Sequence, residues 1–262
     1  MSWNRTWLRA HRRNFGTRPA MACLSSLLPH RSLHCSRRRT AAASAETLRN
    51  PVTTPSPKTA GALKEWAVAI AALANGEQTI LVRKGGIREP TFKPPTDQFI
   101  LFPTSFHSDQ ELLKPGVGER YTSALALEPK QQSVLELSSW VQVTGAWVSH
   151  DERLLDSLED QHIWSRAFLE ARLQWRAKQP LTLLELRTWN FAQPLQLQVR
   201  PEFFGCFSFL DLGPGLADGA LAQPGALPAL NDWEFAERQA ALRQRLAGLD
   251  IAPLDIPKTH TL

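Results

Sequence analysis

The sequence predicts an α+β fold in which a mixed or antiparallel sheet of about six strands is flanked by helices. Short apolar runs bounded by glycine and proline indicate strands, as at Thr79–Arg83 and Gln98–Phe102. An apolar stripe at helical spacing along Asp151–Lys178 indicates helix. We therefore expect this helical region, a helix near Leu63 and a C-terminal helix to pack against the sheet.

The first 45 residues have the composition of an organelle transit peptide. They contain nine arginines and no acidic residue, and they close on Arg-Arg-Arg-Thr-Ala-Ala-Ala at 37–43. A secretory signal is disfavoured because the apolar stretch at 20–28 is short, contains serines and is followed by more arginines. The alternative is a basic arm that binds nucleic acid. We place cleavage between Arg39 and Glu46.

The net charge of +5 does not predict nucleic-acid binding. Nine of the 30 basic residues lie in the leader and all 25 acidic residues follow it, which leaves 21 basic against 25 acidic residues. No apolar run reaches the roughly 18 residues of a membrane span, so a soluble protein without membrane contact is expected. Only Cys206 follows the leader, which excludes an internal disulfide or a cysteine-cluster zinc site in the body.

The segment Leu63–Ala74 carries apolar residues at helical spacing on an alanine-rich background. This favours a helix that ends at Asn75-Gly76. A strand at Ala67–Leu73, joined by an Asn-Gly hairpin to Thr79–Arg83, is the alternative. Periodicity leaves both open, and the alanine content favours the helix.

The strands predicted next differ in pattern. Thr79–Arg83 is apolar without alternation, which is typical of a strand buried on both faces. A proline-rich loop separates it from Gln98–Phe102, which Pro103 is expected to stop. Val134–Ser149 alternates in part and predicts one long strand that bends or bulges at Gly145.

The C-terminal half contains further strands and one more helix. Strands are predicted at Leu181–Arg187, Leu195–Val199 and Phe204–Leu212. Asn231 and Glu234 resemble a capping box and predict the start of the last helix. The expected segments are a transit peptide at 1–45, a linker at 46–60, one α+β domain at 61–212, a Gly/Pro/Ala-rich connector at 213–230, a C-terminal helix at 231–248 and a tail at 249–262.

Several sequence blocks carry a resemblance to a known family. They include Leu63–Ala69, Arg83–Ile87, Phe99–Thr104, Arg172–Arg176 and Gly205-Cys206. In this order they resemble the uncharacterised family called domain of unknown function 1802, and the resemblance covers 62–212. That family is found in cyanobacteria and algal lineages, which implies a chloroplast for the leader, with the mitochondrion as the alternative. The resemblance implies no activity.

A fold-level likeness points to the PUA-like barrels, particularly the ASCH and EVE domains. Those domains pair a helix bearing Trp-Ala with a Gly-x-Lys-Thr turn into a strand that ends in Arg. Trp66-Ala67, the turn at 76–80 and Arg83 are similar in this chain. Gln78 replaces the lysine, which argues against direct transfer of their binding chemistry. The likeness implies that the sheet is barrel-like.

The best candidate ligand site is the basic diglycine loop, which contains Arg83, Lys84, Gly85, Gly86 and Arg88. Successive glycines let backbone N–H groups approach an anion while the cations supply charge. The loop is neither a Walker loop nor a dinucleotide fingerprint, because the spacing and the lysine-serine pair are missing. A tight turn with two solvated cations is an equal alternative.

Four further residues are candidates for the same ligand, and each has a plainer explanation. Trp66 could simply pack in the core, as tryptophans usually do. Arg172 and Arg176 could be favoured by the dipole at the C-terminus of a helix. His107 could lie in a surface loop. Cys206 is expected to be a small buried residue rather than a nucleophile. No catalytic residue, metal site or cofactor is predicted.

The sequence favours a non-catalytic plastid binding module with RNA or a nucleotide as its ligand. Two alternatives remain open. One is an enzyme that acts on a phosphorylated or nucleotide substrate and uses the same loop as its anion site. The other is a structural scaffold in an organellar complex, although no protein partner is identified.

Overall fold

A mixed eight-stranded sheet organises the part of the chain that the structure describes. The structure is a computed structural model, and it describes residues 61–85, 91–106, 112–212, 216 and 225–259. The strands are β1 (Gly61–Trp66), β2 (Ile80–Lys84), β3 (Gln98–Thr104), β4 (Val134–Ser149), β5 (Leu181–Gln198), β6 (Phe209–Asp211), β7 (Leu227–Pro228) and β8 (Ile251–Pro253). The helices are α2 (Ala67–Ala74), α3 (Val117–Arg120), α4 (Thr122–Leu125), α5 (Arg153–Ser157), α6 (Arg166–Gln174) and α7 (Asp232–Leu246), with 3-10 turns η2 (Pro129–Gln131) and η3 (Pro201–Phe204).

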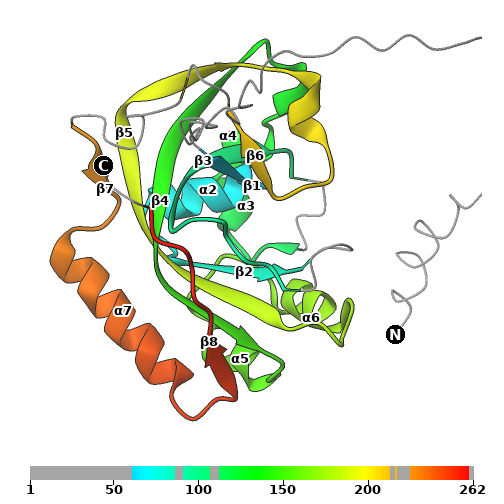
Figure 1. The fold of residues 1–262 in the computed structure, drawn as a ribbon, viewed down its shortest axis with the longest axis vertical. Coiled ribbons are helices and arrows are strands. Elements are labelled where there is room, and N and C mark those ends of the chain that lie inside the picture. The colour runs from blue at the N-terminus through cyan, green and yellow to red at the C-terminus, as the bar shows by residue number, and fades with distance from the viewer. Residues whose placement is uncertain (1–60, 86–90, 107–111, 213–215, 217–224, 260–262) are drawn as a thin grey trace, which may run out of the picture. The chain divides into compact units, whose positions relative to one another are not determined.

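The sheet is curved, and its described strands do not close on one another. The main order is β2-β5-β4-β3-β1-β6, with β7 beside β5 and β8 beside β4. Among the described strands, only β1 and β3 are parallel neighbours. The long strands β4 and β5 run as curved ribbons past helix α2 (Figure 1). The prediction of an α+β fold with a mixed sheet is confirmed, with more strands than expected.

The predicted long strand at Val134–Ser149 is confirmed as β4. Its register with β5 shifts at two places, and one of them adjoins Gly145 as predicted. Near the other shift, Pro194 lies in a stretch of β5 that has no β4 partner, so its missing N–H removes no ladder hydrogen bond. The two strands predicted at Leu181–Arg187 and Leu195–Val199 therefore join into one.

The helix predicted from Leu63 is wrong for its first turn and right for the rest. Gly61–Trp66 forms β1, which pairs with β3 and β6, and α2 begins at Ala67. Two neighbouring strands outweigh the local helical preference of an alanine-rich segment. Helix α2 ends at Ala74 with Asn75 as its C-cap, and Gly76 has φ 69°, as the Asn-Gly signal predicted. The alternative strand at Ala67–Leu73 is wrong.

Three other expectations need correction. Strand β3 continues through Pro103, because at that point only β1 pairs with it and no hydrogen bond to β4 is lost. The helical region Asp151–Lys178 is two short helices, and Ser165 caps the second by accepting a hydrogen bond from the Phe168 N–H. The strand predicted at Phe204–Leu212 is limited to β6.

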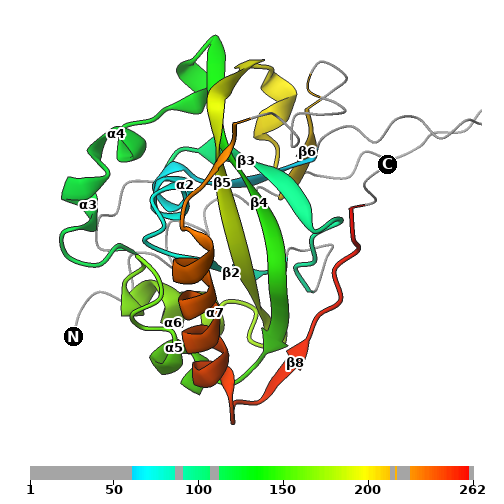
Figure 2. The same ribbon diagram turned by 90° about the vertical axis from the view of Figure 1, so that its left-hand side faces the viewer.

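Helix α7 confirms the predicted C-terminal helix. Asn231 and Glu234 form the expected capping box, and Gly248 follows the helix with φ 81°. The helix lies beside the β4–β5 pair (Figure 2), where its Arg243 contacts Glu185 of β5 at 3.2 Å. The segment predicted as a tail contributes β8, which pairs with β4.

Two clusters of buried apolar side chains lie on the two faces of the sheet. Phe99 and Leu101 of β3 belong to one, and Ile100 and Phe102 belong to the other, as the alternation of side chains along a strand requires. Cys206, predicted to be buried, is exposed because it lies in the turn that leads to β6 rather than in a strand. Among the described residues, no helix has both the length and the apolar character needed to cross a membrane.

Candidate functional site

Arg83 connects two strands, β2 and β1, that are not paired with each other directly among the described residues. It lies on β2, and its guanidinium donates hydrogen bonds to the Lys64 carbonyl of β1 at 3.2 Å and to Ser208 Oγ, just before β6, at 3.3 Å. It also forms a 2.6 Å ion pair with Glu65, and the two side chains are only 16% and 8% exposed. We call the gap between β2 and β1 that Arg83 bridges the seam.

Glu65 is fixed by both of its carboxylate oxygens. One accepts a hydrogen bond from the Trp66 N–H at 2.9 Å, and the other accepts from Arg83. The Arg83 guanidinium also lies over the Phe92 ring, 4.8 Å from its centroid. The predicted alternative of a solvated turn cation is therefore wrong for Arg83, because this side chain is part of the packed structure.

A small cavity lies at the seam. Its volume is about 10 Å³, which is room for about one water molecule. The lining residues are Glu65, Trp66, Leu81, Val82, Arg83, Trp164, Phe168 and Arg172. Three residues predicted from the sequence as ligand contacts, Trp66, Arg83 and Arg172, therefore converge there from β1, β2 and α6.

Arg172 is the cation of this cavity that lacks an acidic hydrogen-bond partner within the described part of the chain. Its guanidinium lies over the Phe168 ring, 4.7 Å from the centroid. Burial, followed by repulsion from Arg83, lowers the pKa of Arg172 to about 10, and Glu65 acts in the opposite direction. Arg172 thus stays charged at neutral pH, and an anion in the cavity would offset this repulsion.

Packed aromatic rings form one wall of the cavity. Trp66 meets Trp164 edge-on at 5.2 Å and lies at 5.4 Å from Phe168 in a tilted arrangement. Phe106 contacts Trp66 edge-on at 4.9 Å. These contacts fix the Trp66 indole as part of the wall, so it is not an open platform on which a base could stack.

Lys84 is not brought to the cavity. It is buried, and its ammonium donates a hydrogen bond to the Leu173 carbonyl at 2.5 Å, near the C-terminus of α6. Burial, followed by the charge of Arg172, lowers the pKa of Lys84. A cation placed against the last carbonyls of a helix stabilises that helix. Lys84 is therefore not the solvated turn cation of the predicted alternative either.

The remaining predicted residues are separate from the cavity or outside the described residues. Gly85 is buried directly after β2. Arg176 stacks on Trp175, 4.8 Å from the ring centroid, beyond the end of α6, and Trp175 is largely exposed. The other three predicted residues lie outside the described residues; they are Gly86, Arg88 and His107.

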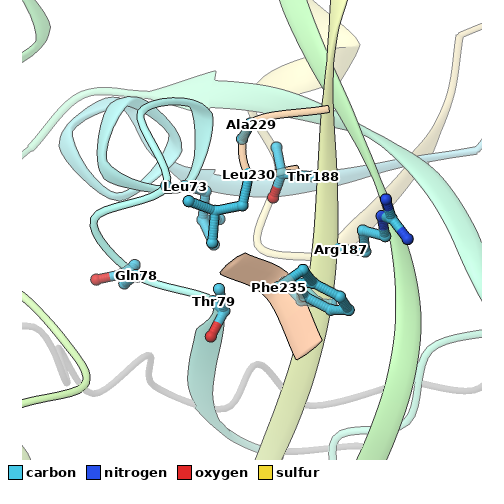
Figure 3. A pocket seen from close by; sticks show the side chains of 10 residues that line it. Leu73, Gln78, Thr79, Arg187, Thr188, Ala229, Leu230 and Phe235 are labelled. Atoms are coloured by element: carbon cyan, nitrogen blue, oxygen red, sulfur yellow. The ribbon is translucent and has the colours of Figure 1, made fainter. Parts of the chain in front are cut away.

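A second cavity, also of about 10 Å³, lies between the α2–β2 turn, β5 and the start of α7 (Figure 3). Leu230 packs against Gly76 so closely that an added Cβ would come within 2.5 Å of its Cδ2. Gln78, in the motif position of the ASCH lysine, is buried: it donates to the Ile80 carbonyl and accepts from the Ile163 N–H, both at 3.1 Å. This position is therefore structural in the present chain.

His162 is a buried titratable group away from the seam. Its Nδ1 accepts a hydrogen bond from the Trp164 N–H at 3.2 Å, and the Lys114 ammonium donates to its carbonyl at 2.9 Å. Burial, followed by the nearby charge of Lys114, lowers the pKa of His162 to about 4. No group of three His, Cys, Asp or Glu side chains within the described ranges is placed to hold a metal ion.

The comparisons with known proteins decide the family. The family model described as "Domain of unknown function (DUF1802)" matches residues 62–241, more than half of the chain. The chain belongs to the DUF1802 family. The resemblance predicted from the sequence blocks is thereby confirmed. A search of curated proteins found no match to this DUF1802 protein.

Two solved structures similar to the DUF1802 protein are the ASCH protein of Zymomonas mobilis and a single-residue mutant of it. The mutant structure is 13% identical in sequence, has a TM-score of 0.33 and covers 71% of this chain and 98% of its own. The other is 12% identical, has a TM-score of 0.32 and covers 70% and 95%. ASCH domains are among the PUA-like domains that the sequence resembles.

Sequence reasoning missed Glu65 in the DUF1802 protein. This carboxylate faces the same cavity as Arg83 and Arg172, and the sequence pattern hides it because the alanine-rich segment Leu63–Ala74 predicts one helix. In a strand, Leu63 and Glu65 lie on the same side of the backbone. An acidic residue two positions from a fully buried leucine would have indicated a buried ion pair.

Proposed function

We propose that this DUF1802 protein is a non-catalytic binding module for RNA or a nucleotide, and that a phosphate of the ligand reaches the seam cavity at Arg172. The observation that carries the proposal is the Arg172 guanidinium, which lines the cavity beside Arg83 without an acidic hydrogen-bond partner among the described residues. Guanidinium groups match phosphate oxygens in charge and in hydrogen-bond geometry.

The cavity size supports recognition of the phosphate rather than the base. A volume of about 10 Å³ admits one oxygen atom but no aromatic ring. Trp66 is held by neighbouring rings and does not offer a free face. Contacts to phosphates position a nucleic acid without reading its sequence. Binding should therefore depend little on base sequence.

The test compares two charge-removing variants of one helix in the full-length chain. Arg172→Gln removes the cation at the cavity. Arg166→Gln is the matched control, because Arg166 also lies on α6 but pairs with Asp156 and with Glu170, the latter at 2.8 Å. Binding of a fluorescently labelled single-stranded RNA is measured by anisotropy. We expect Arg172→Gln to weaken binding about tenfold or more, as the loss of a charge-assisted hydrogen bond implies, and the control to change it little.

Salt dependence provides a second readout. Each phosphate contact to a single strand contributes about −0.7 to the slope of log K against log salt. The slope should therefore be less negative by about 0.7 in Arg172→Gln. Absence of RNA binding at low salt, or equal losses in both variants, would overturn the proposal. Product released from a nucleotide during incubation with the protein would overturn its non-catalytic part.

We also propose that residues 1–45 direct the protein to the plastid. Nine arginines without an acidic residue support import into an organelle. The segment lies outside the described residues, so the proposal rests on composition and on the family resemblance. A fluorescent protein fused to these 45 residues should accumulate in chloroplasts of algal cells. Accumulation in mitochondria would favour the alternative.

A further inference from the structure

The charged groups around the seam cavity leave one net positive charge. Arg83 and Arg172 each contribute one, from β2 and α6, and Glu65 of β1 subtracts one. Lys84 does not line the cavity, and its ammonium donates a hydrogen bond to the Leu173 carbonyl near the end of α6. Among the described residues that line the cavity, the charged side chains are those of Glu65, Arg83 and Arg172.

Glu65 cannot withdraw from an incoming ligand. It is 8% exposed in its side chain, and both oxygens are engaged, at 2.9 Å with the Trp66 N–H and at 2.6 Å with Arg83. A phosphate at Arg172 therefore lies beside a fixed carboxylate. A single negative charge is compensated by the net charge of the cavity, whereas a second one would lose its hydration without a partner.

We infer that the seam cavity selects phosphodiesters over phosphomonoesters, with Glu65 as the residue that determines this specificity. A phosphodiester carries one negative charge, and a phosphomonoester carries about 1.5 to 2 near pH 7 because its second pKa is about 6. The inference rests on the proposed function and narrows it. The ligand is the interior of an RNA strand rather than a free nucleotide.

The experiment uses a matched pair of competitors against labelled RNA, namely uridine 5′-monophosphate and its methyl ester. They share the nucleoside and differ in the second ionisation. We expect the methyl ester to compete about threefold better at about pH 7.5, the size of a partly exposed charge interaction. At about pH 5.5 the monophosphate carries mostly one negative charge, so the difference between the two competitors should disappear in the wild-type protein, with no substitution.

Glu65→Gln gives the second arm. Removing the carboxylate should strengthen binding of the monophosphate about threefold more than binding of the methyl ester. Equal competition by the two compounds at about pH 7.5 would overturn the inference. If RNA binding still requires Arg172 in that case, the proposed function stands and only the selectivity is refuted. If Arg172→Gln has no effect, the proposed function itself fails.

Discussion

The ion pair between Arg83 and Glu65 can be tested by a double-mutant cycle in the full-length chain. Arg83→Met keeps an apolar chain over Phe92 but leaves the buried Glu65 with one hydrogen bond, from the Trp66 N–H. Breaking a buried pair from one side costs about 3–5 kcal/mol. Arg172 also faces Glu65, which places the expected loss at about 3 kcal/mol.

Glu65→Gln should cost less. The amide oxygen still accepts from the Trp66 N–H, and Arg83 retains the Lys64 carbonyl and Ser208. We expect about 1–2 kcal/mol for this single variant. In the double variant neither Glu65 nor Arg83 is left charged without the other, so it should lose about 2–3 kcal/mol rather than the sum, which corresponds to a coupling of about 2 kcal/mol.

Urea unfolding near pH 7 measures all four free energies. The midpoint should decrease while the slope stays constant, because the change is local. A coupling below about 0.5 kcal/mol would refute the view that Glu65 and Arg83 stabilise the seam as a pair.

Three further predictions concern stability. The native pKa of His162, about 4, lies below the unfolded value of 6.5. Titration of this group therefore hardly affects the free energy of unfolding above pH 6.5, and it lowers that free energy increasingly as the pH falls toward 4. Wild type should lose about 2 kcal/mol more than His162→Gln between pH 7 and about pH 5, and parallel unfolding curves would contradict this. Asn231→Ala removes the capping box and should destabilise the protein by about 1 kcal/mol in urea titrations, whereas an unchanged midpoint would show that α7 does not need its cap. Gly76→Ala forces φ 69° on an alanine and brings its Cβ against Leu230. Thermal unfolding should show a loss of stability of at least about 1 kcal/mol. Adding Leu230→Ala should restore only the part of this loss that comes from the contact with Leu230.

Local signals predicted the elements that local chemistry determines. The glycine and partial alternation in Val134–Ser149 identified β4 and one bulge. Asn231 and Glu234 located the start of α7, because a capping box needs only four consecutive residues. Strand β1 was missed because its stability comes from β3 and β6, which follow far later in the chain.

The candidate site was predicted in part for the same reason. Trp66, Arg83 and Arg172 do meet, but the pairing of Arg83 with Glu65 spans 18 residues and two strands, and no local pattern encodes it. The separation of Lys84 from Arg83 was predictable in principle. Successive side chains on a strand point to opposite sides, so Lys84 is expected on the side of β2 opposite to Arg83.

The hydrogen bonds of Arg83 across the seam also affect the tendency of the folded protein to aggregate. Beyond Leu63, the Lys64 N–H donates to the Ser208 carbonyl at 2.8 Å, and among the described strands β2 pairs only with β5, so β1 and β2 face each other at the seam without strand pairing. Exposed strand edges invite pairing with another chain, and natural sheets protect them with charged side chains. Arg83 occupies the Lys64 carbonyl and places a guanidinium between the two edges. Loss of Arg83 should therefore favour aggregation from the folded state, in addition to weakening the fold.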